Sequence, residues 1–340
     1  MKYSVVIATH NRAAELRETL RSLAALRTPH AWEVVVCDNN STDATHEVVG
    51  LEAATFPVPL HYVFEPVPGR SAALNAAIAR ASGDVILTTD DDVRVEVDWL
   101  DQAGQALDVL DCDYIGGRVS PVWGGPQPSW LPGRGGRLWG VIALLDYGEE
   151  PFEFTTRMPL GVNMAFRRDV FWRVGGWDPR VGRKGGTLLG QEVREWCIRA
   201  RAAGVRGFYA PSLALRHIIP AGRLNTRYFR RWFYWRGISR ALLYQQQALD
   251  MENPQGERID VSRVVHIGGV PRYLLRTAAR QAAAMLRALV RGDRPAAFEH
   301  ELWLWMFAGI VRQRWRDRRL TWDTTWTDCS TPRSRARTAP

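Results

Sequence analysis

Four short and nearly continuous apolar runs in the first third of the chain constrain the fold most. They lie at residues 3–8, 32–37, 60–64 and 85–89. A strand that is apolar along its whole length is buried on both faces, which is typical of a parallel sheet covered by helices. Apolar residues at helical spacing predict helices over residues 12–26, 44–51 and 71–81. The pattern predicts an α/β fold with a mostly parallel sheet flanked by helices.

Polar side chains follow three of these strands at the points where the strands end. They are Thr9, Asn11 and Arg12 after the first strand, Asp38 after the second, and Asp90, Asp91 and Asp92 after the fourth. Ligands of open α/β sheets bind outside the carboxyl ends of the strands. Because adjacent carboxylates repel one another, the triplet needs a compensating charge, and Mg²⁺ and Mn²⁺ prefer carboxylate oxygens. The pattern favours a divalent-cation site over a solvated turn that caps the next helix.

Glycine-rich phosphate loops are absent from this edge of the predicted sheet. No strand is followed by G-x-G-x-x-G or by G-x-x-x-x-G-K-[ST], which are the fingerprints of dinucleotide-binding and P-loop proteins. A dehydrogenase and a P-loop nucleotidase are therefore disfavoured. The charge of a bound diphosphate would have to be neutralised by a metal ion instead.

Seven sequence blocks connect these strand ends to the middle of the chain. They are SVVIATHNRAAEL at 4–16, VVVCDNNSTDAT at 34–45, GRSAALNAAIARASGD at 69–84, the Asp triplet with WL at 99–100, GVNMAFRRDVFWRVGGWDP at 161–179, GQEVREWCIRARAAG at 190–204 and LRHIIPAGRLNTRYFRRWFYWRG at 215–237. In this order they resemble inverting family-2 glycosyltransferases with the GT-A fold, and residues 3–217, nearly two thirds of the chain, share the likeness. The resemblance implies metal-dependent transfer of a sugar from a nucleotide-diphosphate donor to an acceptor hydroxyl, in the synthesis of a polysaccharide, glycolipid or other glycoconjugate. Processive synthases carry a Gln-x-x-Arg-Trp element, whereas this chain has Arg230, Arg231 and Trp232 without the Gln, so we expect a non-processive enzyme.

The resemblance also implies a donor site. Its nucleotide-binding residues would be Thr9, Asn11, Arg12, Asp38, Arg70, Asn75, Asp90 and Asp91. Among them, Asp38 would hydrogen-bond the base and Asp90 would approach the ribose. Asp92 would ligate the Mn²⁺ or Mg²⁺ that bridges the diphosphate, together with Asp90, and His217 would complete the metal site. Asp91 could share either role. A lone His is more often structural than a ligand, so even with the resemblance both interpretations of His217 stay open.

A catalytic base is implied at the start of a helix that follows a glycine-rich loop. The sequence there is Gly190-Gln191-Glu192, so Glu192 occupies the position at which the family has Asp. A carboxylate at this point would accept the proton of the acceptor hydroxyl during direct displacement at the sugar C1. The plainer interpretation of Glu192 is a first-turn carboxylate favoured by the helix dipole. By the same resemblance, the donor sugar or the acceptor would be contacted by Gly161, Asn163, Gly190 and Trp196.

The C-terminal third is basic and patterned as helices. Residues 218–340 carry 22 Lys and Arg against 10 Asp and Glu, whereas residues 1–217 carry 23 against 26. Residues 272–291 are amphipathic, and the run LWLWMFAGIV within residues 298–315 is too short to span a bilayer. Two interpretations stay open: the helices pack on the catalytic domain, or they lie in a membrane interface near a lipid-linked acceptor.

Three segments are expected along the chain. They are a GT-A catalytic domain over residues 1–225, a helical region over 226–322 and a disordered tail over 323–340. No run of 18 apolar residues is present, the first residues lack the apolar core of a secretory signal, and the four cysteines are isolated. The expected location is the cytoplasm, with peripheral contact at the inner face of the cell membrane as an open alternative.

Two other functions stay open on the residues alone. A nucleotidyltransferase shares an α/β sheet and an acidic metal site, but the glycine-rich basic loop expected after its first strand is missing here. A basic protein that binds nucleic acid or membrane without catalysis would leave the Asp triplet and Glu192 unexplained. We therefore expect a glycosyltransferase that uses a nucleotide sugar and a glycan, lipid-linked or small-molecule acceptor, with no nucleic-acid partner.

Overall fold

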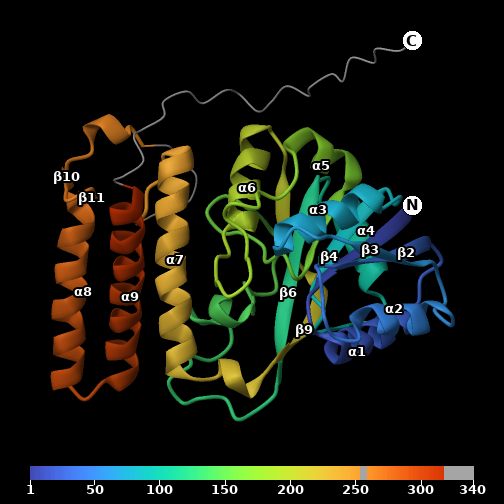
Figure 1. Ribbon diagram of the computed structural model, residues 1–340, viewed down its shortest axis with the longest axis horizontal. Helices are drawn as coiled ribbons and strands as arrows, with labels where there is room; N and C mark the ends of the chain where they lie inside the picture. The colour runs from blue at the N-terminus through green and yellow to red at the C-terminus, as the bar shows by residue number, and fades with distance from the viewer. Residues whose placement is uncertain (253–258, 318–340) are drawn as a thin grey trace.

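A nine-stranded mixed sheet forms the centre of the computed structural model, which describes residues 1–252 and 259–317 (Figure 1). The strand order is β3-β2-β1-β4-β8-β6-β9-β5, and β7 pairs with β9. The four predicted strands lie side by side and parallel as β1 (Lys2–Thr9), β2 (Ala31–Asp38), β3 (Leu60–Phe64) and β4 (Val85–Thr89). The prediction of a mostly parallel sheet flanked by helices is confirmed.

The direction of the strands changes beyond β4, and this change shapes the candidate site. The strands of this half are β5 (Val93–Val95), β6 (Tyr114–Trp123), β7 (Phe152–Glu153), β8 (Met164–Arg167) and β9 (Gly207–Ile219). β8 runs antiparallel to both β4 and β6, while β6 and β9 are parallel. β5 pairs antiparallel with the later part of β9, so that Val93 lies opposite His217. A residue from late in the chain therefore reaches the end of the Asp triplet.

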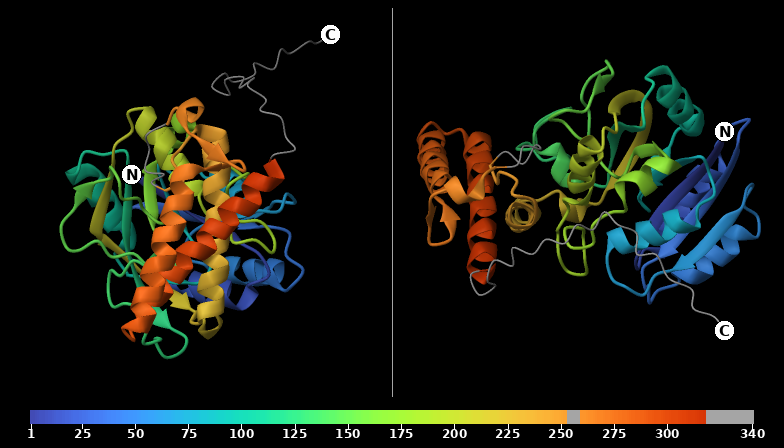
Figure 2. Two further views of the ribbon diagram at one scale, coloured as in Figure 1. Left: turned by 90° about the vertical axis from the view of Figure 1, so that its left-hand side faces the viewer. Right: turned by 90° about the horizontal axis from the view of Figure 1, so that it is seen from above.

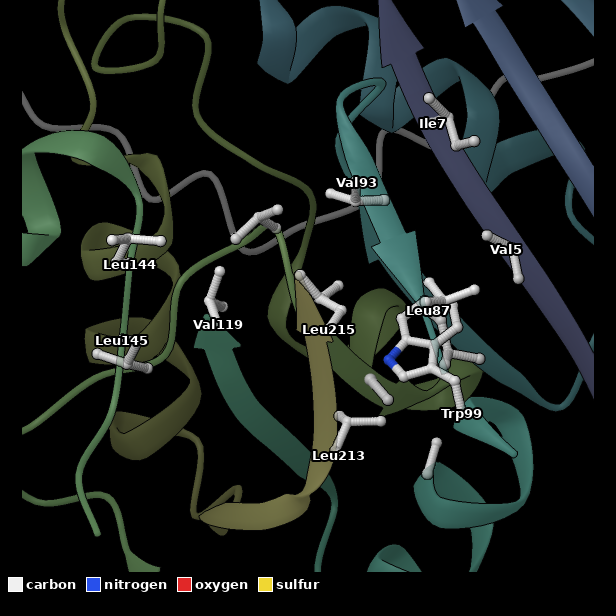
Figure 3. Close-up of a cluster of buried hydrophobic side chains, with 14 of the residues drawn as sticks. Val5, Ile7, Leu87, Val93, Trp99, Val119, Leu144, Leu145, Leu213 and Leu215 are labelled. Carbon is white, nitrogen blue, oxygen red and sulfur yellow. The ribbon is translucent and has the colours of Figure 1, made fainter. Parts of the chain in front are cut away.

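Helices cover both faces of the sheet. One face packs on α1 (Ala13–Ala24), α2 (Thr45–Ala53) and α4 (Trp99–Val109), and the other on α3 (Arg70–Arg80), α5 (Arg168–Val174) and α6 (Glu192–Ala202). Successive side chains of β1 point to opposite faces: Val5 and Ile7 join the core under α1 and α4 (Figure 3), and Val6 joins the core under α3. This two-sided burial explains why the strands read as continuous apolar runs. The first three predicted helices correspond to α1, α2 and α3, with ends that differ by one or two residues.

The C-terminal region is a layer of three long helices. They are α7 (Thr226–Gln247), α8 (Arg272–Val290) and α9 (Arg294–Asp317). Figure 2 shows α7 against the half of the molecule that contains the sheet and α8 as the outermost helix. At the α7–α9 contact, a Cβ on Gly237 would come within 1.9 Å of the Met306 carbonyl oxygen, and a Cβ on Gly309 within 2.0 Å of the Tyr234 carbonyl oxygen. The two glycines therefore allow the helix backbones to approach closely.

The helical region shares its core with the half of the molecule that contains the sheet. Phe229 of α7 and Phe298 and Leu302 of α9 belong to the same buried cluster as the β1 and α1 side chains. Among the described residues, no helix is both long enough and apolar enough to cross a bilayer. A short strand pair, β10 (His266–Ile267) and β11 (Val270–Pro271), precedes α8. The predicted disordered tail at 323–340 lies outside the described residues.

Candidate active site

An acidic cluster with one histidine lies in the segment that joins β4 to β5, beside the pairing of β5 with β9. Single ligand atoms of Asp90, Asp92 and His217 lie within 4.8 Å of one another. His217 Nδ1 is 3.2 Å from the Ile142 carbonyl oxygen, in the 3₁₀ helix Trp139–Ile142. Since a carbonyl only accepts, Nδ1 donates, and a neutral imidazole then presents its Nε2 lone pair to Asp92 Oδ1 at 3.0 Å.

Two lone-pair donors at this distance repel unless a positive charge lies between them. A proton on Nε2 or a shared cation would relieve the contact, and two carboxylates with one imidazole are a donor set that suits Mn²⁺ or Mg²⁺. Burial alone would raise the pKa of Asp92, but the hydrogen bond and charge of a protonated His217, together with Arg12 and Arg223, outweigh burial and hold this pKa below its usual range. Asp92 therefore stays ionised, as a metal ligand must.

Arg12 and Thr9 secure the middle of the triplet. The Arg12 guanidinium lies 2.9 Å from Asp91 Oδ1 and 2.7 Å from Asp92 Oδ2, and Thr9 Oγ1 donates to Asp91 Oδ2 at 2.8 Å. The Asp91 carbonyl also accepts from Thr19 Oγ1. Burial raises the pKa of Asp91 to about 7 against the opposing charge of Arg12, with Asp92 adding to the rise. Asp91 is thus enclosed by the protein, and Asp90 and Asp92 are the members that face the cluster with His217.

Arg70 connects the acidic cluster to the start of α6. Its guanidinium lies 2.7 Å from Asp90 Oδ1, 3.5 Å from Glu192 Oε1 and 3.3 Å from the Gly161 carbonyl oxygen. Glu192 is buried as the first residue of α6, and its Oε2 has no hydrogen-bond partner among the described residues. An unpartnered buried carboxylate oxygen is costly and is expected mainly where another molecule completes it.

Asp38 and Asn11 brace the loops at the ends of β2 and β1. Asp38 is buried and accepts from the Tyr62 hydroxyl at 2.9 Å and from the Ser41 backbone at 2.9 Å. Asn11 has a left-handed backbone, with φ of 52°, and its Oδ1 accepts from the Thr42 backbone at 2.7 Å. Each Asp38 oxygen can still accept another hydrogen bond. Asp38 therefore keeps the capacity to bind a nucleotide base.

Two predicted ligand-binding asparagines are engaged by the protein itself. Both ends of the Asn75 amide bond the Trp177 backbone, at 2.9 Å each. Asn163 is fully buried, accepts from Trp99 Nε1 and donates to two backbone carbonyls. These side chains therefore position loops beside the site.

Trp196 lies in the core and does not line the site. Its side chain is 0% exposed, its Nε1 donates to the Gly175 carbonyl at 3.0 Å, and its ring packs against Trp177, Tyr114 and Phe166. A ring without exposed surface has no face on which a sugar could stack. We therefore remove Trp196 from the candidate site.

Gly190, predicted for the same part of the site, lies at an open position. A Cβ placed on this glycine would meet no atom of the described residues within 4 Å. Gly190 immediately precedes the N-cap residue of α6 and lies two residues before Glu192. There is therefore space beside the start of α6 for another molecule.

Three contributors to the site were missed in the sequence. The Ile142 carbonyl orients His217, Tyr62 holds Asp38, and Arg223 adds positive charge near Asp92. Tyr62 could have been suspected, because it lies two residues before the carboxyl end of β3. Arg223 follows His217 by six residues in the same sequence block. A backbone carbonyl such as that of Ile142 leaves no signal in a sequence.

Comparison with known proteins places these features in context. A family model described as "Glycosyl transferase family 2" matches residues 4–175. A glucosyl-dolichyl phosphate glucuronosyltransferase of Haloferax volcanii is 29% identical over 257 residues, covering 74% of this chain and 80% of the relative. The succinoglycan biosynthesis protein ExoM of Rhizobium meliloti is 25% identical over 240 residues, covering 70% and 74%.

Solved structures resemble the fold. The mannosyltransferase PcManGT from Pyrobaculum calidifontis, in complex with GDP-Man and Mn²⁺, superposes with a TM-score of 0.62 at 21% identity and covers 92% of this chain and 87% of that one. GalNAc-T7 with UDP, GalNAc and Mn²⁺ superposes with a TM-score of 0.53 at 17% identity, covering 74% and 52%. These likenesses confirm the predicted GT-A fold.

Proposed function

The chain belongs to glycosyl transferase family 2, and from this membership we propose that it transfers a sugar from a nucleotide-diphosphate donor to an acceptor hydroxyl with inversion. The observation that carries the proposal is the position of Arg70. It joins Asp90, in the acidic cluster, to Glu192, whose Oε2 is unpartnered among the described residues. A donor-side cluster and an acceptor-side base are thus held next to each other.

The donor would bind at the carboxyl ends of β1, β2 and β4. Asp90, Asp92 and His217 would hold a Mn²⁺ or Mg²⁺ ion, which would neutralise the departing diphosphate. Asp38 would accept from the base, and Arg12 would keep Asp92 in place. Thr9, Asn11 and Asn75 would act by positioning these loops, and Asp91 by anchoring Arg12.

Glu192 would act as the catalytic base. The acceptor oxygen would form its bond to the sugar C1 as the bond from C1 to the diphosphate breaks, and Glu192 Oε2 would take the hydroxyl proton. Arg70 fixes the other carboxylate oxygen, so the proton-accepting atom would keep one orientation. A single displacement of this kind inverts the configuration at C1. Gly161 and Gly190 would border the space taken by the donor sugar and the acceptor.

A lipid-linked acceptor is the class that we favour. One relative is named for glucuronosyl transfer to glucosyl-dolichyl phosphate and another for succinoglycan biosynthesis, so a glycan acceptor is the alternative. The solved neighbours hold GDP-Man in one case and UDP in another, so the donor would be a sugar linked to a nucleoside diphosphate. The reaction would take place in the cytoplasm, at the inner face of the cell membrane.

A panel of nucleotide sugars tests the proposal. We expect one member to raise the melting temperature in the presence of Mn²⁺ or Mg²⁺, and to lose this effect in Asp92→Asn. Product analysis should show a sugar with inverted anomeric configuration and a free nucleoside diphosphate. Release of pyrophosphate would instead indicate a nucleotidyltransferase. If no nucleotide sugar stabilises the wild type with either metal, the proposed function is wrong.

A further inference from the structure

The turn between α8 and α9 exposes large aliphatic side chains. Leu286, Leu289 and Val290 are 58%, 52% and 89% exposed. They are adjacent on the last turns of α8, so they form one patch at residues 286–294, which we call the α8 tip. A contiguous exposed apolar patch with a polar rim is typical of an interaction site.

Positive charge runs along α8 and continues into this patch. Residues 272–294 contain six arginines and one aspartate, and the arginines are Arg272, Arg276, Arg280, Arg287, Arg291 and Arg294. All six are exposed. Within residues 1–252 and 259–317, no ion pair engages Arg276, Arg287, Arg291 or Arg294. The charge on this surface is therefore available to an external anion.

The arginines and the aliphatic residues share one stripe of α8. At 100° per residue, Arg276, Arg287 and Val290 lie within about 60° of one another, and Leu286 adjoins Val290 on the other side. The apolar end and the basic flank therefore face outward together. Helices that lie in a bilayer interface have this composition, with aliphatic residues inserted and arginines at the head groups.

Other occupants fit this surface less well. Single-stranded nucleic acid is bound by aromatic stacking platforms, whereas the tip exposes Leu and Val. A second copy of the chain in a two-fold contact would place the same patch on both sides, and the unpaired arginines would then face each other. An acidic lipid surface satisfies both the charge and the aliphatic residues.

Side-chain contacts connect the helices that carry the α8 tip to the half of the molecule that contains the sheet. Arg230 of α7 pairs with Glu301 of α9, and the Trp130 ring packs between Phe229 and Phe298. Leu289 and Arg294 line a hollow of about 280 Å³ together with Trp130. Trp130 therefore serves in packing between α7 and α9.

The tip also lies toward the same end of the molecule as the acidic cluster. α7 begins shortly after β9, the strand that carries His217. In Figure 1 the start of α7, the ends of β6 and β9 and the α8–α9 turn lie along the same lower edge. A membrane bound to the α8 tip would therefore lie at the end of the molecule where β6 and β9 end.

We propose that the α8 tip docks on a membrane rich in acidic phospholipids, with Leu286, Leu289 and Val290 inserted and the arginines at the phosphate groups. Docking would bring the active site to the plane in which a lipid-linked acceptor resides. Only this last consequence rests on the proposed function, because docking itself requires no catalysis.

Vesicle flotation of the full chain tests the proposal. The wild type should float with vesicles of phosphatidylcholine and phosphatidylglycerol, less so at high salt, and remain unbound with phosphatidylcholine alone. The pair Leu286→Ser/Val290→Ser and the triple Arg276→Gln/Arg287→Gln/Arg291→Gln should each lower the bound fraction by about tenfold or more. The matched controls Leu51→Ser and Val109→Ser replace aliphatic residues that are 65% and 74% exposed on α2 and α4, and should float like the wild type.

The outcomes separate docking from catalysis. The melting-temperature shift with metal and nucleotide sugar, measured without vesicles, should be the same in the tip variants as in the wild type. Failure of the wild type to float, or equal flotation of the tip variants, would overturn the docking proposal while leaving that shift intact. RNA binding or self-association that the Leu286→Ser/Val290→Ser pair abolishes, without an effect on vesicles, would also overturn it.

Discussion

Buried carboxylates at the two ends of the central sheet have very different partners. At the amino-terminal ends of β1 and β2, Glu33 Oε1 accepts from Ser4 Oγ at 2.6 Å and from the Ser82 backbone and hydroxyl at 2.6 and 2.8 Å. Lys2 and His61 lie near its second oxygen at 3.7 and 3.4 Å. At the carboxyl ends, the Asp triplet and Glu192 share two arginines, and Asp92 Oδ1 and Glu192 Oε2 receive no hydrogen bond from the described residues.

The contrast teaches how to tell a structural carboxylate from a functional one in the same sheet. Burial would raise the pKa of Glu33, but its hydrogen bonds from Ser4 and Ser82 and the charge of Lys2 lower it to about 2. The protein therefore completes the charge of Glu33 by itself. The carboxyl-end cluster is incomplete without a cation and a substrate hydroxyl, and this incompleteness is the physical mark of a site.

The largest expected effect is on Glu192. Glu192→Gln removes the proton acceptor and retains the shape of the side chain, so transfer should fall by about 10³-fold. Donor-dependent stabilisation should persist, because the donor-side residues are unchanged. Steady-state kinetics and a thermal-shift assay measure the two quantities separately.

Glu195→Gln is the matched control for this variant. Glu195 lies one turn further along α6, where it pairs with Arg199 and accepts from Gln247. We expect a lower melting temperature and a kcat within a few-fold of the wild type. If Glu195→Gln abolished turnover and Glu192→Gln did not, the catalytic base would have to be reassigned. The presence or absence of a hydrogen-bond partner would then not distinguish a structural carboxylate from a functional one.

The next largest effect concerns the metal site. Asp92→Asn removes the ionised oxygen beside His217 and should lower kcat/KM by about 10²-fold and weaken the metal-dependent thermal shift. Asp98→Asn, an exposed residue at the start of α4, should change neither quantity. An Asp92→Asn protein that kept the full metal-dependent shift would place the cation elsewhere.

Much of the donor side could be predicted because parallel strands end at a common edge. The apolar runs located the ends of β1, β2 and β4, and sheet geometry then brought Thr9, Arg12 and the Asp triplet together. The separate roles of Asp90, Asp91 and Asp92 could not be predicted, because successive residues after a strand point in different directions. Asp91 turns to Thr9 and Arg12, while Asp90 turns to Arg70.

The rest of the site depended on contacts that local patterns do not specify. His217 reaches Asp92 only because β5 pairs with β9 across more than a hundred residues, and its ring is oriented by a backbone carbonyl. Trp196 and Glu192 are four residues apart on α6, and the resemblance assigned both of them to the site, Trp196 as a sugar contact and Glu192 as the base. Tertiary packing against Trp177 and Tyr114 placed Trp196 in the core.

At the opposite end of the sheet, Glu33→Gln should act on stability and not on turnover. Neutralising Glu33 weakens charge-assisted hydrogen bonds in a buried setting, and we expect a loss of about 2 kcal/mol in the free energy of unfolding at pH 7. Chemical denaturation measures this loss, and kcat should stay within twofold of the wild type. A large fall in kcat without a stability change would show that the two ends of the sheet are not functionally distinct.

The pH dependence of this stability difference follows from the lowered pKa. The pKa of Glu33 is about 2 when folded, against an ordinary value of 4.5. Its contribution is therefore fully present above pH 4.5 and declines as the pH falls from 4.5 towards 2. Denaturation curves of wild type and Glu33→Gln should be well separated at pH 7 and approach each other near pH 3. A difference that stays constant from pH 7 to pH 3 would contradict this origin.

The smallest effects come from the hydroxyl groups of Ser4 and Thr9, at opposite ends of β1. The Ser4 hydroxyl also accepts from the Gly83 backbone at 2.8 Å. Ser4→Ala removes the hydroxyl that donates to Glu33 at 2.6 Å, and Thr9→Val removes the one that donates to Asp91 at 2.8 Å. Each should cost about 1–2 kcal/mol of unfolding free energy, because each leaves a buried carboxylate with one donor fewer. Only Thr9→Val should also weaken the metal-dependent shift, since Asp91 shares Arg12 with Asp92. Equal effects of both variants on that shift would mean that the whole strand, and not its carboxyl end, supports the site.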